Sequence, residues 1–302
     1  MATLSPMDTP GVTLHHATYP FIAPPKYRKA HQGKVVLITG AGRGIGKATA
    51  LAFAAAGAHV AVLARTTQEV AAVVTEIKTR FGVPTLGITG SVLDDAAAIV
   101  RQVEEELGPI DILINNAGTQ RMAPFAAEED LGIWWRVFEV NLKAPLAFIH
   151  AVLPSFLARG RGTSITVGSA ASEQPLPNMS AYVGSKAGLQ RTIEMLDAEL
   201  RPQGLLNFYL HPGSVNTALA DPNNAELYAT AEMRTMIKGF HEILIDTPEL
   251  AADSMVALTA NETGAHFLSG RFVSVNEDLG ELLAKREEIE SRNLFHLRVQ
   301  RP

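Results

Sequence analysis

Three polar side chains near the middle of the chain are of types that move protons to and from a carbonyl or alcohol oxygen. Tyr182 and Lys186 are four residues apart on a predicted helix, so their side chains share one face. A tyrosine that works near neutral pH needs its pKa lowered from about 10 towards 7, which corresponds to about 4 kcal/mol. A lysine about 5 Å away supplies roughly 3 kcal/mol at an effective dielectric of about 20. The pair also fits an exposed amphipathic helix; Ser169, after an apolar run upstream of Tyr182, favours a site.

A glycine-rich turn, TGAGRGIG at 39–46, separates the first apolar run from an alanine-rich segment. Glycines allow the backbone to approach a ligand closely, and a helix N-terminus offers N–H groups and a positive dipole end to a pyrophosphate. A tight strand-to-helix turn needs glycine even without a ligand. The position of this turn, after the first predicted strand and before the first helix, favours dinucleotide binding.

These residues are positioned by a regular alternation of elements that begins at Lys34. The predicted strands are 35–39, 60–64, 85–88, 111–115, 164–167, 205–210 and 272–275, and most are apolar on both faces, as buried strands are. Segments of helical spacing between them include 45–56, 67–81, 96–107 and 181–200. The alternation predicts a single α/β domain with a doubly wound parallel sheet, whose ligand sites gather at the carboxyl ends of the strands.

Six motifs occur in the order and spacing of the short-chain dehydrogenase/reductase family, which the chain resembles over roughly residues 34–275. They are TGAGRGIG at 39–46, NNAG at 115–118, Asn141 in VNLKAP, Ser169 in VGSAAS, YVGSK at 182–186 and HPGSVNT at 211–217. The resemblance implies a seven-stranded, Rossmann-like fold and hydride transfer between a nicotinamide cofactor and a ketone or alcohol.

The resemblance also implies a role for each polar residue of the catalytic group. Tyr182 would donate a proton to the carbonyl oxygen during reduction, or accept one in the reverse direction, and Ser169 would hold that oxygen. Lys186 would lower the pKa of Tyr182 and bind the ribose hydroxyls of the cofactor. Asn141 would hold a water of the proton relay behind the lysine; without the other three residues it would be interpreted as an asparagine bonded within its own helix.

The cofactor-binding residues that the resemblance implies lie on turns after successive strands. They are Gly40, Arg43, Gly44, Ile45 and Gly46 in the glycine turn, Arg65 after the second strand, Ser91 and Val92 after the third, Asn115, Asn116, Ala117 and Gly118 after the fourth, Pro212, Gly213, Val215 and Thr217 around the nicotinamide, and Tyr182 and Lys186 themselves. His211 matches no catalytic position of the family and is interpreted as structural.

Two positions depart from the family pattern. Arg65 follows the second strand where NAD-preferring members carry an acidic residue, and an arginine can pair with a 2′-phosphate. Arg43 favours the same cofactor, so we expect NADP(H) rather than NAD(H), although a solvated arginine ahead of a helix would look the same. Ser91 stands where the family usually has aspartate, which predicts weaker recognition of the adenine.

Both ends of the chain fall outside the domain at 34–275. Residues 1–33 are proline-rich and predict an arm on the surface or a disordered leader. Residues 276–302 form a charged tail with apolar residues at nearly helical spacing, which could cover the substrate cleft or a partner subunit. With the leader, this tail resembles a subgroup common in fungal natural-product pathways. A lid is expected at about 214–246, and its apolar residues favour a lipophilic or aromatic carbonyl substrate unless they pack against the core.

Composition excludes several chemistries and partners. The chain has no cysteine, so it has no disulfides, thiolate nucleophile or thiolate metal site, and no HExxH pattern forms, so no metal is expected. A net charge of −5 and the lack of a long apolar span predict binding to neither nucleic acid nor membrane. The N-terminus lacks the basic start and apolar run of a signal peptide, so a cytoplasmic protein is expected. Family analogy predicts a homodimer or homotetramer. Two alternatives stay open: a non-redox dehydratase or epimerase, and a dinucleotide-binding sensor without turnover.

Overall fold

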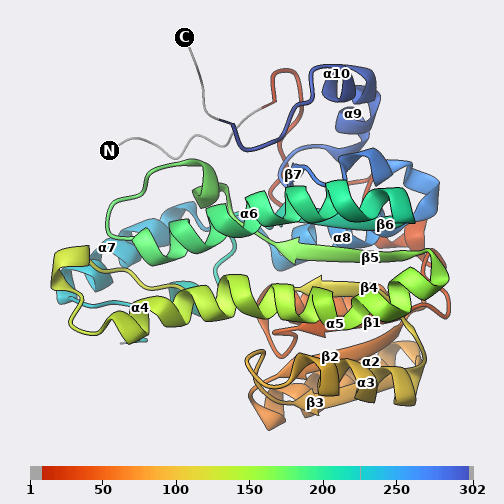
Figure 1. Ribbon diagram of the computed structural model, residues 1–302, viewed down its shortest axis with the longest axis horizontal. Helices are drawn as coiled ribbons and strands as arrows, with labels where there is room; N and C mark the ends of the chain where they lie inside the picture. The colour runs from red at the N-terminus through yellow and green to blue at the C-terminus, as the bar shows by residue number, and fades with distance from the viewer. Residues whose placement is uncertain (1–8, 225, 299–302) are drawn as a thin grey trace.

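Seven parallel strands form one sheet in the computed structural model, which describes residues 9–224 and 226–298 (Figure 1). Across the sheet the strands follow the order β3-β2-β1-β4-β5-β6-β7. Their bounds are β1 (Val35–Thr39), β2 (His59–Ala64), β3 (Thr85–Thr89), β4 (Ile110–Asn115), β5 (Gly162–Val167), β6 (Leu205–His211) and β7 (Phe272–Ser274). The predicted doubly wound parallel sheet is confirmed. The order reverses between β1 and β4, and such a reversal opens the crevice in which ligands bind at the carboxyl edge.

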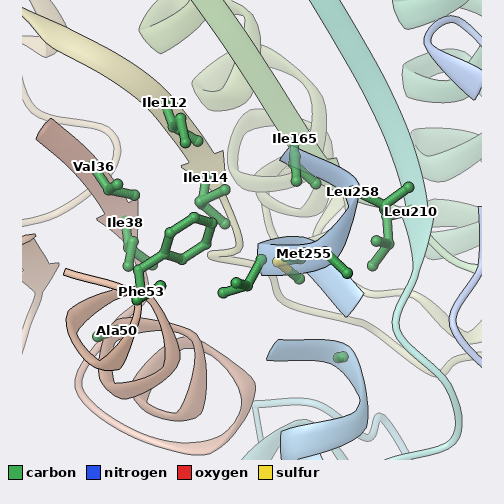
Figure 2. Packing of buried hydrophobic residues seen from close by; sticks show 14 of the residues in the cluster. Val36, Ile38, Ala50, Phe53, Ile112, Ile114, Ile165, Leu210, Met255 and Leu258 are labelled. Atoms are coloured by element: carbon green, nitrogen blue, oxygen red, sulfur yellow. The ribbon is translucent and has the colours of Figure 1, made fainter. Parts of the chain in front are cut away.

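Helices cover both faces of the sheet. One face packs against α1 (Gly44–Ala55), α2 (Thr67–Phe81) and α8 (Pro248–Thr259), and the other against α3 (Ala96–Leu107), α5 (Ala144–Arg159) and α6 (Ser180–Leu200). Strand residues alternate between the two cores, because successive side chains of a strand point to opposite faces. Figure 2 shows the first core, where Phe53 of α1 and Met255 of α8 lie against isoleucines of the central strands.

A continuous helix from Leu131 to Arg159 comprises α4 (Leu131–Phe138), a π-helical turn (Glu139–Lys143) and α5. In the turn, the N–H of Ala144 donates to the carbonyl of Glu139, five residues earlier. This helix is long and apolar enough to cross a membrane, but the core helix of a soluble protein can have the same length and hydropathy. The side chains of α5 that are buried, including Phe148 and Val152, pack in the core shared with α3 and β4.

The N-terminal segment, residues 9–33, lies on the domain beside the C-terminal segment (Figure 1). Leu14 forms an antiparallel bridge with Glu277. Tyr19, Ile22 and Tyr27 are buried in the same core as α1 and α8. This part of the predicted arm is therefore anchored by apolar side chains; residues 1–8 lie outside the described residues.

The tail forms α9 (Leu279–Ala284) and α10 (Arg286–Ser291) and then runs along the outer edge of the sheet. The N–H of Phe272 in β7 donates to the carbonyl of Phe295 (2.8 Å). Farther on, the N–H of Leu297 donates to Glu194 of α6 (2.8 Å). We expected the tail to cover the substrate cleft or a partner subunit. Its described part lies along the edge of β7 and pairs the N–H of Phe272 there.

Candidate active site

The turns after β1 and β4 are joined directly at the carboxyl edge of the sheet. The hydroxyl of Thr39 accepts the N–H groups of Asn116 (3.1 Å) and Ala117 (3.2 Å). The Asn116 side chain donates back to the carbonyls of Thr39 (3.0 Å) and Gly40 (3.1 Å). Asn115 is buried and donates to the carbonyl of Pro145 (3.4 Å), so it braces the turn from below.

The glycine turn is as close to its neighbours as glycine alone allows. A Cβ at Gly46 would lie 2.3 Å from the carbonyl oxygen of Gly40, and one at Gly40, whose φ is +65°, would lie 2.9 Å from Ala117 Cα. A Cβ at Gly44 would lie 3.4 Å from Thr217 Cγ2. The structure thus brings the predicted pyrophosphate turn next to the predicted nicotinamide turn.

These turns fit a dinucleotide. Arg43 occupies the N-cap of α1 and makes no side-chain cap hydrogen bond, so the first N–H groups of this helix are available to an anion. Ile45 and Val92 are partly buried and pack against the two cores on either side of the crevice. Among the described residues, no group of three or more histidine, aspartate or glutamate side chains could hold a metal ion.

Lys186 is a buried cation at the centre of the site. Its residue exposure is only 5%, and Nζ donates to the carbonyl of Val167 (2.7 Å) at the end of β5. Burial lowers the pKa of Lys186 to about 8, so the amine is still mostly charged at pH 7. A Cβ at Gly118 would lie 4.0 Å from Nζ. An ammonium has three N–H donors, so Lys186 retains donors for the hydroxyls of a ribose.

Tyr182 lies on the same face of α6, with its ring centroid 5.9 Å from Lys186 Nζ. We predicted that the lysine lowers the pKa of Tyr182. In the protein by itself burial has the larger effect and raises that pKa, while a hydrogen bond with the Ser169 side chain opposes the rise. The tyrosine is therefore protonated at neutral pH. Ser169 also caps the short 3-10 helix Ala170–Glu173 by accepting the N–H of Ala171 (3.1 Å).

Asn141 uses its side chain to hold the backbone after the NNAG turn. Its Oδ1 accepts the N–H of Thr119 (2.9 Å), and its Nδ2 donates to the carbonyl of Thr119 (2.8 Å) and the hydroxyl of Ser185 (3.1 Å). The asparagine thus bonds across elements and not within its own helix. Its carbonyl cannot receive the usual α-helical bond, because Pro145, four residues later, has no N–H. That carbonyl is the group of Asn141 best suited to hold a water.

Tyr209, which the motifs do not mark, joins two catalytic segments from below. Its hydroxyl accepts the N–H of Ser169 (3.0 Å) and donates to the carbonyl of Lys186 (3.2 Å). The ring occupies the space of a side chain at Gly168, where a Cβ would lie 2.1 Å from the ring. A tyrosine within a fully buried strand needs a partner for its hydroxyl, which is the signal in the sequence that could have identified it.

The turn after β6 is braced by two residues that were not assigned a role in the site. His211, interpreted as structural, accepts the N–H of Ala170 (3.2 Å) beside Ser169, and burial lowers its pKa to about 4, so it is neutral. Asp246 accepts the N–H of Ser214 and lies against Gly213, whose φ is +81°. Val215 forms a parallel bridge with Asp246.

The predicted adenosine-binding residues lie at the ends of β2 and β3, farther along the same edge. Arg65 is exposed, and Arg43 forms an ion pair with Glu69 (3.4 Å), an acidic residue beside Gly42 that the motifs do not mark. The hydroxyl of Ser91 accepts the N–H of Leu93 (3.2 Å). The carboxylate at this point comes from Asp94, whose Oδ2 accepts the N–H of Ser91 (2.7 Å).

Several apolar residues of the expected lid are buried, but in a cluster of their own and not in either core of the sheet. The lid includes α7 (Ala231–Phe240). Leu227, Tyr228, Met233 and Ile237 pack with Met122, which follows the NNAG turn. The side chain of Phe240 lies outside the described residues. The buried lid residues therefore pack against one another and against Met122.

Comparisons with known proteins agree with this geometry. A family model of short chain dehydrogenases matches residues 34–227. A short chain dehydrogenase of Pseudocercospora fijiensis is 41% identical over 285 residues, which cover 92% of this chain and 91% of that protein.

Two solved structures are also similar. A metagenomic short-chain oxidoreductase in complex with NADP is 28% identical, with a TM-score of 0.63 over 77% of this chain and 93% of its own. A 7α-hydroxysteroid dehydrogenase complexed with NADH and 7-oxo glycochenodeoxycholic acid is 27% identical, with a TM-score of 0.71 over 82% of this chain and 95% of its own. The chain belongs to the short-chain dehydrogenase family of oxidoreductases.

Proposed function

We propose that the protein reduces a ketone to an alcohol with NADPH. The observation that carries the proposal is the meeting of Ser169, Tyr182 and a buried Lys186 at the edge where the glycine turn and the NNAG turn join. The bound cofactor would supply the hydride. Ser169 would hold the carbonyl oxygen, and Tyr182 would donate the proton that this oxygen gains. Tyr182 carries its proton at neutral pH, as the proton donor of a reduction must.

Replacing Tyr182 with phenylalanine tests the assignment. The Tyr182→Phe variant should lose turnover by at least about 100-fold, which is typical for the removal of a general acid, and should bind NADPH nearly as well as the wild type. Carbonyl compounds, including aromatic, steroidal and polyketide-like ketones, would be screened by NADPH absorbance. A variant that keeps the wild-type rate would refute the role of Tyr182. Silence of the wild type with every ketone would favour the non-redox enzyme or the sensor.

The preference for NADPH over NADH rests on Arg65. Its guanidinium is exposed directly after β2 and can pair with a 2′-phosphate. Glu69 partly neutralises Arg43, so Arg65 carries more of the preference than Arg43 does. Dissociation constants for both cofactors test this: Arg65→Ala should weaken binding of NADPH about tenfold and leave that of NADH unchanged. Tighter binding of NADH by the wild type would overturn the preference.

A lipophilic, ring-sized substrate is our proposal for the substrate class. It is supported by apolar side chains that stay exposed within the lid, Met236, Ile243 and Ile245. A similar enzyme was solved with a 7-oxo bile acid. In the ketone screen, ring ketones should have higher kcat/KM than small 2-oxo acids; the reverse order would refute this substrate class.

We also propose that the protein forms a homodimer or homotetramer through α4. Phe125, Leu131 and Trp135 are exposed around this helix, with Leu131 and Trp135 four residues apart on one face, and exposed apolar side chains gathered in this way are typical of an interface. Light scattering after size-exclusion chromatography should give a multiple of the chain mass, and Trp135→Glu should reduce it. A monomeric wild type would overturn the proposal.

A further inference from the structure

The turn Pro212–Thr217, which the family resemblance places around the nicotinamide, depends on one buried carboxylate. Asp246 is 7% exposed, and its Oδ2 accepts the N–H of Ser214. In the backbone, the N–H of Asp246 donates to the carbonyl of Ser214 (3.1 Å). A Cβ at Gly213 would lie 2.6 Å from Oδ2. The path of the turn therefore follows the position of this carboxylate.

The other oxygen of this carboxylate is held by the N-terminal segment. His16 Nδ1 lies 2.6 Å from Asp246 Oδ1, and the His16 side chain is 57% exposed while that of Asp246 is 3% exposed. The carbonyl of His16 accepts the N–H of Thr247 (2.9 Å), and Thr18 donates to Asp253 of α8 (2.5 Å). These two hydrogen bonds fix the segment at His16 and at Thr18, and in this position the His16 ring presents Nδ1 to the carboxylate.

The preceding residue makes a similar pair that does not reach the turn. His15 Nε2 lies 2.9 Å from Asp278 Oδ2, and the imidazole stacks on Tyr19 with centroids 3.8 Å apart. Both histidines therefore attach the arm to an aspartate. Only His16 attaches it to the residue that braces Ser214, so His15 is a matched internal control.

We propose that His16 is a positioning residue, which holds the Asp246 carboxylate against the Pro212–Thr217 turn and so sets the affinity for the nicotinamide cofactor. The inference rests on the proposed function, because it takes this turn to contact the nicotinamide. Without the His16 donor, the buried Asp246 carboxylate keeps, among the described groups, the backbone N–H of Ser214 as the donor to its side chain. The carboxylate is then free to rotate towards water. The turn then loses the fixed surface that Gly213 packs on.

Three variants test the role: His16→Ala, His16→Asn and His15→Ala. The amide nitrogen of asparagine can take the place of Nδ1 and donate to Asp246 without carrying charge. The first measurement is hydrogen–deuterium exchange of the ligand-free protein. His16→Ala should raise the exchange of the Ser214 amide about tenfold, because its acceptor is no longer fixed, whereas His16→Asn and His15→Ala should leave it close to the wild-type rate.

The second measurement is NADPH binding. His16→Ala should raise the dissociation constant for NADPH, and its KM, about five- to tenfold with a smaller change in kcat, and His16→Asn should restore most of the affinity. Equal effects of His16→Ala and His15→Ala on exchange and binding would overturn the inference, as would no rescue by asparagine. If the wild type binds neither NADPH nor NADH, the proposed function fails, while the exchange data still decide whether His16 holds the turn.

Discussion

Replacing Tyr209 with phenylalanine removes one oxygen atom from beneath the catalytic residues and leaves the ring in place. The hydroxyl accepts the N–H of Ser169 and donates to the carbonyl of Lys186, so it ties the end of β5 to α6. The ring continues to fill the space over Gly168. The variant therefore tests the two hydrogen bonds and does not create a cavity.

The expected magnitude follows from the group that is left without a partner. The Ser169 N–H loses its acceptor at a partly buried position, and a buried, unsatisfied donor costs about 1–3 kcal/mol. We expect the free energy of unfolding of Tyr209→Phe to fall by about 2 kcal/mol. Because the affected backbone carries Ser169, we also expect kcat to fall about tenfold, equivalent to about 1.4 kcal/mol in activation free energy.

Urea denaturation and steady-state NADPH oxidation on the best ketone of the screen measure the two effects. Tyr19→Phe is the matched control: the Tyr19 hydroxyl is buried, accepts the N–H of Leu279 (2.7 Å) and donates to the carbonyl of Glu277 (3.4 Å), between the arm and the tail. The control should lose stability and keep kcat. If Tyr209→Phe loses stability to the same extent and also keeps its kcat, the positioning role of Tyr209 is refuted.

Three further predictions concern buried groups. Burial lowers the pKa of His31 and of His211 to about 4 in the folded protein, whereas both histidines titrate near about 6.5 in the unfolded chain. Because the unfolded chain therefore binds protons at a higher pH than the folded protein does, the free energy of unfolding should fall by about 2 kcal/mol per histidine between pH 7 and pH 5. Urea denaturation at the two pH values measures this loss. Because the pKa of Lys186 is lowered to about 8, its charge is lost as the pH rises through that value, and kcat/KM for NADPH should decline above it; a flat profile to pH 9.5 would contradict this. Gly168→Ala should lower the melting temperature and kcat, and Tyr209→Leu in the same chain should partly restore the melting temperature, since the clash is with the Tyr209 ring.

The elements and the main turns were predictable because their signals are local. An apolar run such as 35–39 is buried on both faces wherever it lies in a parallel sheet, and its predicted bounds agree with those of β1. The glycines at 40, 44 and 46 follow from the steric demands of the turn itself. Helix spacing likewise placed Tyr182 and Lys186 on one face, and the structure keeps them together.

The direction of the Tyr182 pKa was not predictable in the same way. Charge and spacing alone suggested that Lys186 would lower it, but the amount of water around each group depends on the packing of the whole site. Burial acts on both residues and disfavours the charged form of each. The charged partner of a titratable group can be predicted from the sequence, but the extent to which the group is shielded from water cannot.

The sequence by itself determined the order of strands and helices, the glycine turns and the catalytic residue types, because each depends on neighbours within a few positions along the chain. Only the tertiary structure decided that Tyr209 lies beneath Ser169, that Asp246 braces Ser214, and that His16 reaches Asp246 across 230 positions. Such contacts leave no spacing pattern. They arise where packing brings a buried polar group to a backbone group that needs a partner, and that requirement is met in space rather than along the chain.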